Sequence, residues 1–354
     1  RTLDGKDIME NAQTVENVNP IMRRKEKSKW FDSNNAETSY NNRCGVVLNA
    51  IGSNLQRFVE ASRLALLLRH TLAKQPNACA SLCFRLFVDG PQLSVVSDAG
   101  LLAVGRKIWN SILRYPEVPP VRERRTQGSS HLWLLRISAI LASSEYDVLM
   151  FMDSDAYPCP GISELISWFA TSDFDVASAR PIVPHSGSLG NRALPEPMGG
   201  LLETEKRAWL QFPERNLGFG LLARKRPHVE QLLQRFQAEY IRQMNDTRIL
   251  VNADQSAWRS ALFWAKARHG LVKEKVLPLS QVCRLSKQSL QQHQARYGNA
   301  SCGPCTIMHH AAVEHFIRLP VWSTVARPHL SADFRILLTR GLRSRHAINL
   351  TCHE

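Results

Sequence analysis

The stretch that decides the fold is Tyr146-Asp147-Val148-Leu149-Met150-Phe151-Met152-Asp153-Ser154-Asp155-Ala156-Tyr157. Its apolar centre predicts a buried strand. Two aspartates follow directly, on either side of Ser154. Because successive side chains leave an extended backbone on opposite faces, Asp153 and Asp155 are expected to turn toward one point and Ser154 away from it. Carboxylate oxygens are the ligands that Mg²⁺ and Mn²⁺ prefer, so this turn is a candidate metal site.

A purely structural role for the two aspartates is the alternative. Asp-x-Asp is a short and common pattern, and aspartates also cap helices. A helix is predicted from about Ile162, and the Asp-Ser-Asp turn precedes it. The three residues alone do not choose between a metal site and a cap.

Strand and helix patterns alternate along the chain around this segment. Apolar β-branched runs predict short strands at 46–48, 84–88, 148–152, 175–179, 219–223 and 306–308. Helical patterns lie at 55–72, 99–114, 130–143, 162–169, from Pro227 onward, and 252–268. The alternation predicts an α/β fold with a mostly parallel central sheet and helices on both faces. Residues 180–215, rich in proline and glycine near their start, predict a long binding loop or lid.

Composition divides the chain into three parts. Residues 1–43 are polar and lack apolar periodicity, which predicts a flexible stem or linker. Residues 44–320 carry the predicted strands and helices of one catalytic domain, and 321–354 form a basic C-terminal extension that packs on the domain or trails it.

The net charge of +14 predicts an affinity for anions, whether nucleic acid, acidic lipid or the phosphates of a small substrate. The basic stretch 106–136 lacks interleaved aromatic residues and any nucleic-acid-binding motif, so a solvated face is favoured there. No apolar run approaches the ~20 residues that span a bilayer. A membrane contact is therefore expected only through an anchor preceding Arg1, as in a type II membrane protein.

Eight cysteines and three glycosylation sequons, at Asn245, Asn299 and Asn349, favour a secretory-pathway lumen such as the Golgi. Within Cys302-Gly303-Pro304-Cys305, zinc binding and a redox pair are alternatives. A second pair of ligands at zinc spacing is missing from the sequence. Disulfides to Cys283 or Cys352 are favoured instead.

The segment around Asp153 resembles the signature strand of the GT-A (Rossmann-like) glycosyltransferases, in which apolar residues precede Asp-x-Asp. The resemblance implies that Asp153 and Asp155 hold a divalent metal, Mn²⁺ or Mg²⁺, that bridges the two phosphates of a sugar nucleotide. Arg136, one helix earlier, is similar to the cation that glycogenin-related families place before the motif. Asn49, Ala50 and Ile51 resemble the end of the first strand, which cradles the nucleotide base.

Three later segments extend the resemblance. Asn216-Leu217-Gly218 resembles an Asn-x-Gly segment that lines the donor and the acceptor. Asn252-Ala253-Asp254-Gln255 resembles an Asp-Gln motif, which implies that Asp254 and Gln255 lie near the acceptor or the transferred sugar. His309 resembles the histidine that completes the metal site, with His310 and His315 as alternatives.

The resemblance implies a metal-dependent transfer of a hexosyl or pentosyl unit, with retention favoured. The donor would be a UDP-sugar, or else a GDP-sugar, and the acceptor a hydroxyl of a glycan, protein or polysaccharide. Leu217 stands where Thr or Ser is usual, and a Gly-x-x-Lys-Pro-Trp loop is missing, so a glycogenin-like and a galactosyl- or xylosyltransferase-like subfamily both stay open. Two rival functions also stay open: an inactive nucleotide-sugar-binding protein, and a basic nucleic-acid-binding protein with a structural Asp-Ser-Asp turn.

Overall fold

The computed structural model describes residues 42–72, 79–122, 130–154, 156–180, 196–246, 254–285, 287–298 and 301–310. These residues belong to one unit of the chain, which spans 40–354. The first strand begins at Asn42, so Asn42 and Arg43 lie in the strand rather than in the predicted stem. The remainder of the predicted stem and the predicted C-terminal extension lie outside the described residues.

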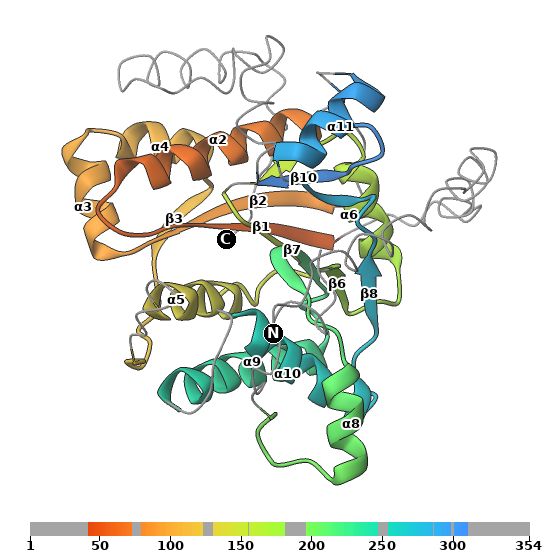
Figure 1. Cartoon of the computed structure of the whole chain (residues 1–354). Coiled ribbons are helices and arrows are strands. Elements are labelled where there is room, and N and C mark those ends of the chain that lie inside the picture. Colours follow the sequence, from red (N-terminus) through yellow and green to blue (C-terminus); the bar gives the residue numbers. More distant parts are fainter. Residues whose placement is uncertain are drawn as a thin grey trace, which may run out of the picture. The chain divides into compact units, whose positions relative to one another are not determined.

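A seven-stranded sheet in the order β3-β2-β1-β4-β7-β6-β8 forms the centre of this unit (Figure 1). Its strands are β1 (Asn42–Ala50), β2 (Cys79–Val88), β3 (Ser111–Arg114), β4 (Val148–Met152), β6 (Val176–Ala179), β7 (Asn216–Leu222) and β8 (Glu274–Leu277). β1, β2, β3 and β4 are parallel to one another, β6 is parallel to β8, and β7 runs antiparallel to both β4 and β6. The predicted α/β class with a mostly parallel sheet is confirmed.

Helices cover both faces of the sheet (Figure 1). The helices in the described ranges are α2 (Leu55–Leu72), α3 (Gly90–Asp98), α4 (Leu102–Ile108), α5 (Ser130–Leu141), α6 (Ile162–Thr171), α8 (Glu203–Gln211), α9 (Pro227–Asn245), α10 (Gln255–Leu262), which continues as a π-helix over Phe263–Arg268, and α11 (Lys287–Tyr297). Residues of α2, α4 and α6 share one core with alternate strand residues such as Val46 and Met150. Residues of α5, α9 and α10 share the other with Val47 and Phe151. None of the helices in the described ranges is both long and apolar enough to cross a membrane.

A smaller three-stranded sheet is tied to its surroundings by disulfides. Its order is β5-β10-β9, with β5 (Ala156–Pro158), β9 (Val282–Leu285) and β10 (Ile307–His310). Disulfides join Cys159 to Cys302 and Cys283 to Cys305. The zinc and redox alternatives for Cys302 and Cys305 are therefore wrong, and the predicted pairing with Cys283 is confirmed. Cys352 lies outside the described residues.

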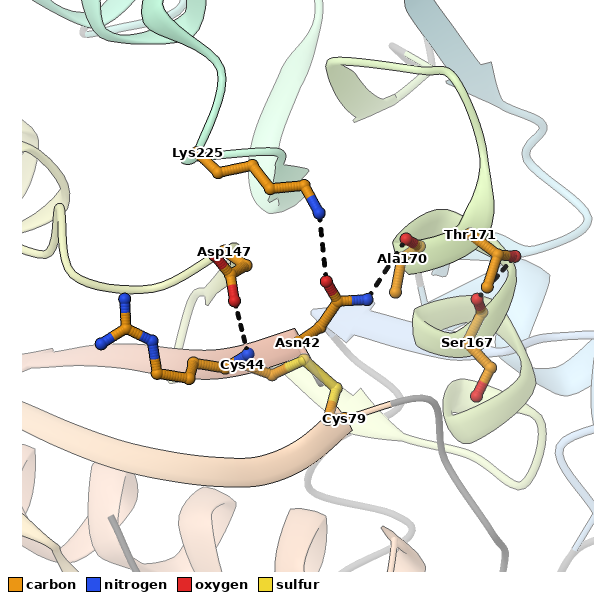
Figure 2. The surroundings of a disulfide bond; sticks show 9 residues. Asn42, Cys44, Cys79, Asp147, Ser167, Ala170, Thr171 and Lys225 are labelled. Carbon is orange, nitrogen blue, oxygen red and sulfur yellow. Dashed lines mark hydrogen bonds between the residues drawn. A yellow bond between two sulfur atoms is a disulfide. The ribbon is translucent and has the colours of Figure 1, made fainter. Parts of the chain in front are cut away.

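At the amino-terminal ends of β1, β2 and β4, a disulfide and several hydrogen bonds join the strands to each other and to neighbouring segments (Figure 2). The Cys44–Cys79 disulfide joins β1 to β2. The amide of Asn42 accepts a hydrogen bond from Lys225 Nζ at 3.1 Å and donates one to the Ala170 carbonyl at 3.5 Å. Asp147 Oδ2 accepts from the Arg43 backbone N–H at 2.8 Å. These contacts occupy one edge of the sheet and leave the carboxyl-terminal edge of β1 and β4 for a site.

Three predictions need correction. The helix predicted over 99–114 ends at Ile108, and β3 follows it as an edge strand too short to show a period. The predicted loop 180–215 contains α8. Finally, β5 lies between Asp153 and α6, whose N-cap is Gly161 in a left-handed conformation (φ 96°). Asp153 therefore does not cap that helix, and the structural alternative is wrong for this residue.

Candidate active site

The order of the strands singles out one place on the sheet for a ligand. The chain passes from β1 outward to β2 and β3, then returns to β4 on the other side of β1. In open α/β sheets, ligands bind outside the carboxyl ends of the strands at such a reversal. Asn49 and Ala50 end β1 at this point, with Ile51 directly after them, and Asp153 follows β4. Two groups of predicted residues thus lie at the same carboxyl-terminal edge of the sheet.

Asp153 follows β4 because all five residues of that strand are buried and the apolar run stops there. Its backbone N–H donates to the Gly218 carbonyl of β7 at 2.9 Å, which fixes the start of the turn. Its side chain is 29% exposed, so the carboxylate is held but still reachable. Ser154 lies in the turn, and Asp155 lies outside the described residues.

Arg136 of α5 is the central cation of the site. Its Nη1 lies 2.8 Å from Asp153 Oδ1 and 3.6 Å from Asp254 Oδ2. Its Nη2 donates to the Leu217 carbonyl, and the guanidinium lies over the ring of Phe151. Although it is nearly fully buried, Arg136 is thus bound on several sides, as a buried charge requires. Among the sequence-predicted residues, Arg136, Asp153 and Asp254 are brought together.

Asp254 occupies the N-cap position of α10 but makes no side-chain capping bond there. Its side chain instead faces Arg136 and a small, mostly apolar cavity that Phe151, Leu217 and Trp258 also line. Burial raises the pKa of Asp254 to about 6; Arg136 lowers it and the nearby Asp153 raises it. Gln255, the first residue of α10, is half-buried, and Asn252 and Ala253 lie outside the described residues.

His309 enters the site from β10, which pairs with β5 immediately after the Asp-Ser-Asp turn. Its Nε2 lies 3.5 Å from Asp153 Oδ2, and the residue is 4% exposed. The side chain of His310 and the whole of His315 lie outside the described residues. The structure therefore places His309, the first of the three candidate histidines, beside the carboxylate.

Gly218 is required by this approach of His309. A Cβ atom at residue 218 would lie 2.3 Å from His309 Cε1 and 2.9 Å from Asn216 Oδ1, closer than atoms can approach. Asn216 Oδ1 accepts from the Gly218 N–H at 2.8 Å. The Asn-x-Gly segment thus shapes the wall behind Asp153, with Asn216 bonded to the backbone of the segment.

The chemistry of the donor set fits a divalent metal. Two ligands in neighbouring positions of an octahedral Mg²⁺ or Mn²⁺ site, each ~2.1 Å from the ion, lie about 3 Å apart. The 3.5 Å between Asp153 Oδ2 and His309 Nε2 is close to this spacing. No group of three or more possible metal ligands occurs among the described residues, a set that does not include Asp155.

Two charged residues of the site were missed by the sequence analysis. Glu214 precedes β7 and is buried; burial raises its pKa to about 7, while Arg259 lowers it and Asp254 raises it. Arg259 of α10 is 1% exposed and donates to the carbonyls of Phe212 (2.6 Å) and Trp209. The one sequence signal for Glu214 was that a charged pair, Glu214-Arg215, directly precedes an apolar strand. Arg215 itself forms an ion pair with Glu274 at 2.6 Å.

The residues that the resemblance implies for base binding lie at the part of this edge formed by β1, β2 and β3. Asn49 Oδ1 accepts a hydrogen bond of 2.8 Å from the hydroxyl of Tyr115, which follows β3. Asp89 follows β2 and accepts from the N–H groups of Gly52 and Gln92, each at 2.9 Å. The loops after the first three strands are therefore bonded to one another. Tyr115 and Asp89 were not predicted as members of the site.

No protein-family model and no curated protein matches this sequence. Among solved structures, the chain is similar to the galactosyltransferase LgtC in complex with donor and acceptor sugar analogues (13% identity, 84% of this chain and 95% of that chain, TM-score 0.42). It is also similar to the glycosyltransferase GlyE of Streptococcus pneumoniae (13%, 85% and 63%, 0.43) and to mouse xyloside xylosyltransferase 1 (13%, 77% and 98%, 0.39). All three are glycosyltransferases, the class named by the sequence resemblance. At these identities and TM-scores, the residues of the site have to carry any conclusion on function.

Proposed function

We propose that this chain is a metal-dependent glycosyltransferase that moves a sugar from a nucleoside-diphosphate donor, with UDP-sugars favoured over GDP-sugars, to a hydroxyl of a glycan or protein. One observation carries the proposal. At the strand reversal, Asp153 directs one carboxylate oxygen to Arg136 at 2.8 Å and the other toward His309 at 3.5 Å. A carboxylate and an imidazole on one side and a buried guanidinium on the other suit a diphosphate with its cation.

Mn²⁺ or Mg²⁺ held by Asp153 and His309, with Asp155 as the further expected ligand, would act as a Lewis acid on the leaving diphosphate. Arg136 supplies fixed positive charge at the same place and needs no reorganisation, because three sets of contacts already orient it. The net charge of +14 favours the arrival of an anionic donor.

The geometry supports a positioning role for Asp254. The residue is 2% exposed and its Oδ2 lies 3.6 Å from Arg136 Nη1, so in this arrangement it is placed to orient the guanidinium. Near neutral pH, above its pKa of about 6, the carboxylate is mostly ionised and pairs with Arg136. Direct contact of Asp254 or Gln255 with the transferred sugar, and retention of configuration, stay predictions.

The direct test incubates the full chain with UDP-glucose, UDP-galactose, UDP-xylose and GDP-mannose and measures nucleotide release with Mn²⁺, Mg²⁺ or EDTA. We expect release from one donor, dependent on the metal, and a loss on the order of a thousandfold in Asp153→Asn. Asp147→Asn is the matched control, because Asp147 directly precedes β4, at the end of the strand opposite to Asp153. Full activity in EDTA would contradict the metal. Metal-dependent binding of a nucleotide with no transfer to any acceptor would identify an inactive binding protein.

A further inference from the structure

The two residues expected to hold the metal come from distant parts of the chain. Asp153 follows β4, and His309 lies in β10. The small sheet brings them together, because β5 begins directly after the Asp-Ser-Asp turn and pairs with β10, with His309 opposite Ala156. This pairing comprises three residue pairs. A short ladder thus sets the 3.5 Å distance between Asp153 Oδ2 and His309 Nε2.

A disulfide supports this ladder at the end away from the metal ligands. Cys159 directly follows β5 and is bonded to Cys302, which precedes β10. The Cys159 N–H also donates to the Thr306 carbonyl at 2.9 Å, which extends the ladder by one bond. The two cysteines lie 143 positions apart in the sequence. Among the disulfides between described residues, this one alone joins the segment of Asp153 to that of His309.

The neighbouring disulfide has a different place in the small sheet. Cys283 lies in β9 and is bonded to Cys305, which shortly precedes β10. Because β9 runs parallel to β10, this disulfide ties two adjacent strands, and its cysteines lie 22 positions apart in the sequence. It therefore holds β10 in the sheet but does not link β10 to β5 or to the Asp-Ser-Asp turn.

The Cys159–Cys302 disulfide is also the more accessible of the two. Cys302 is half-buried, whereas Cys283 and Cys305 are 7% and 3% exposed. Reduction of a disulfide requires a thiolate to reach one of its sulfur atoms. A small dithiol should therefore open the Cys159–Cys302 bond, by attack at Cys302, before it opens the Cys283–Cys305 bond.

We propose that the Cys159–Cys302 disulfide is a redox-sensitive positioning element of the metal site: when closed, it holds β5 against β10 and His309 beside Asp153, and its reduction weakens the binding of the divalent metal. The inference rests on the proposed function, since it requires a metal at Asp153 and His309. The reductant is a dithiol. The S–S bond breaks, both cysteines become thiols, and the dithiol closes to its own disulfide, so that two electrons and two protons pass to the protein.

Reduction should weaken the metal site without removing it. The β5–β10 residue pairs and the bond from the Cys159 N–H to Thr306 do not depend on the disulfide. His309 therefore stays in the small sheet but is less firmly held beside Asp153. Loss of the support of a metal ligand typically lowers metal affinity about 10- to 100-fold, and an effect of this size is expected here.

The test is calorimetric titration of the full chain with Mn²⁺, both with the disulfides closed and after treatment with dithiothreitol, which is removed before the titration. Reduced wild type and oxidised Cys159→Ser/Cys302→Ser should both bind Mn²⁺ about 10- to 100-fold more weakly than oxidised wild type. Reoxidation should restore the affinity of the wild type and leave that of the variant unchanged.

Cys44→Ser/Cys79→Ser is the matched control. It removes the disulfide between β1 and β2 at the amino-terminal ends of these strands, whereas Asp153 follows the carboxyl end of β4 (Figure 2). This variant should keep the Mn²⁺ affinity of oxidised wild type. Thermal unfolding of each variant is measured alongside, so that a change in metal affinity can be compared with any change in stability.

Stepwise reduction of the wild type tests the same point without a variant, and so serves even if Cys159→Ser/Cys302→Ser does not fold. After each step, free thiols are alkylated under denaturing conditions and located by mass spectrometry, and Mn²⁺ affinity is measured on a parallel sample. Opening of Cys159–Cys302 should precede opening of Cys283–Cys305 and should coincide with the loss of affinity. Wild-type affinity in protein whose Cys159–Cys302 bond is open would overturn the proposal.

Failure of the proposal and failure of the proposed function are distinguishable. An oxidised wild type that does not bind Mn²⁺ would overturn the proposed function itself. Unchanged Mn²⁺ affinity in a folded Cys159→Ser/Cys302→Ser, or an equal loss in Cys44→Ser/Cys79→Ser, would overturn the role of the disulfide and leave the proposed function standing.

Discussion

The two ends of the carboxyl-terminal edge of the sheet are built from different interactions. Over β1, β2 and β3, the side chains of Asn49, Asp89 and Tyr115 bond to one another's loops through short hydrogen bonds of 2.8–2.9 Å. Over β4, β7 and β10, buried charges meet instead: Arg136 is shared by Asp153 and Asp254, and Glu214 lies within the influence of Arg259. At the first end, Asn49, Asp89 and Tyr115 already form hydrogen bonds within the protein. The second holds two carboxyl groups whose pKa is raised, to about 6 and about 7.

This difference shows that the charged end, and not the hydrogen-bonded end, lowers the free energy of unfolding. Buried carboxyl groups with raised pKa values oppose folding when they ionise, and such groups gather at functional sites. Under the proposed function, the charged end would hold the phosphates and the cation. Mutations at the charged end should therefore have large and pH-dependent effects, and those at the hydrogen-bonded end small ones.

The largest effect is expected from Arg136→Met. This change leaves Asp153 and Asp254 without their shared cation, and removing one partner of a buried ion pair costs about 3–5 kcal/mol. Urea unfolding at neutral pH measures the loss. Addition of Asp254→Asn should recover part of it, because the uncompensated charge disappears. Additive effects of the two changes would contradict the coupling.

Gly218→Ala should displace His309 and weaken metal binding. The new methyl group would lie 2.3 Å from His309 Cε1, so the imidazole has to move away from Asp153. Disturbance of a ligand's support typically costs 10- to 100-fold in metal affinity. Mn²⁺ titration followed by calorimetry gives the value. Gly90→Ala is the control, since a Cβ there meets no atom. Equal Mn²⁺ affinity in both variants would contradict the assignment of His309 as a metal ligand.

Glu214→Gln should change how stability depends on pH. Because the folded-state pKa of Glu214 is raised from 4.5 to about 7, its contribution is fully present below pH 4.5 and is lost as the pH rises through about 7. The loss is on the order of 3 kcal/mol. The glutamine variant, always neutral, should therefore lose less stability between about pH 4.5 and 7. Glu203→Gln on the exposed surface of α8 should leave the wild-type profile, and an identical profile in Glu214→Gln would refute the assignment.

The smallest effect is expected at the hydrogen-bonded end. Asp89→Ala removes the N-cap of α3 and the acceptor of the Gly52 N–H, which should cost about 1–2 kcal/mol in urea unfolding. Mn²⁺ affinity should stay at the wild-type value. A drop in Mn²⁺ affinity as large as in Gly218→Ala would mean that the two ends are not separate.

The sequence could predict those elements of the fold that have a clear apolar pattern of their own. The run Val148–Met152 is buried throughout, as its composition indicates, and α2 spans the predicted residues 55–72. Short strands escape such prediction, because β3, β5 and β9 owe their pairing to neighbours rather than to their own period. The π-helix after α10 cannot be predicted from an apolar pattern for a different reason. It differs from a continuing α-helix in which backbone groups are hydrogen-bonded.

For the site, residues at strand ends were predictable and their partners were not. Asp153 and Asn49 follow or end apolar runs that the sequence shows directly. Tyr115, Glu214 and Arg259 lie in segments without a motif, and they join the site only because strands far apart in sequence end side by side. Asp254 lies beside Arg136, and its predicted place near a substrate stays a prediction.

The central claim is that Asp153 and a divalent cation together hold the diphosphate. Calorimetric titration of UDP into the full chain over a range of Mn²⁺ concentrations, in wild type and in Asp153→Asn, tests it most directly. We predict that UDP affinity of the wild type rises at least about tenfold with Mn²⁺ and that the variant does not respond. Equal UDP affinity of the wild type in Mn²⁺ and in EDTA would contradict the claim.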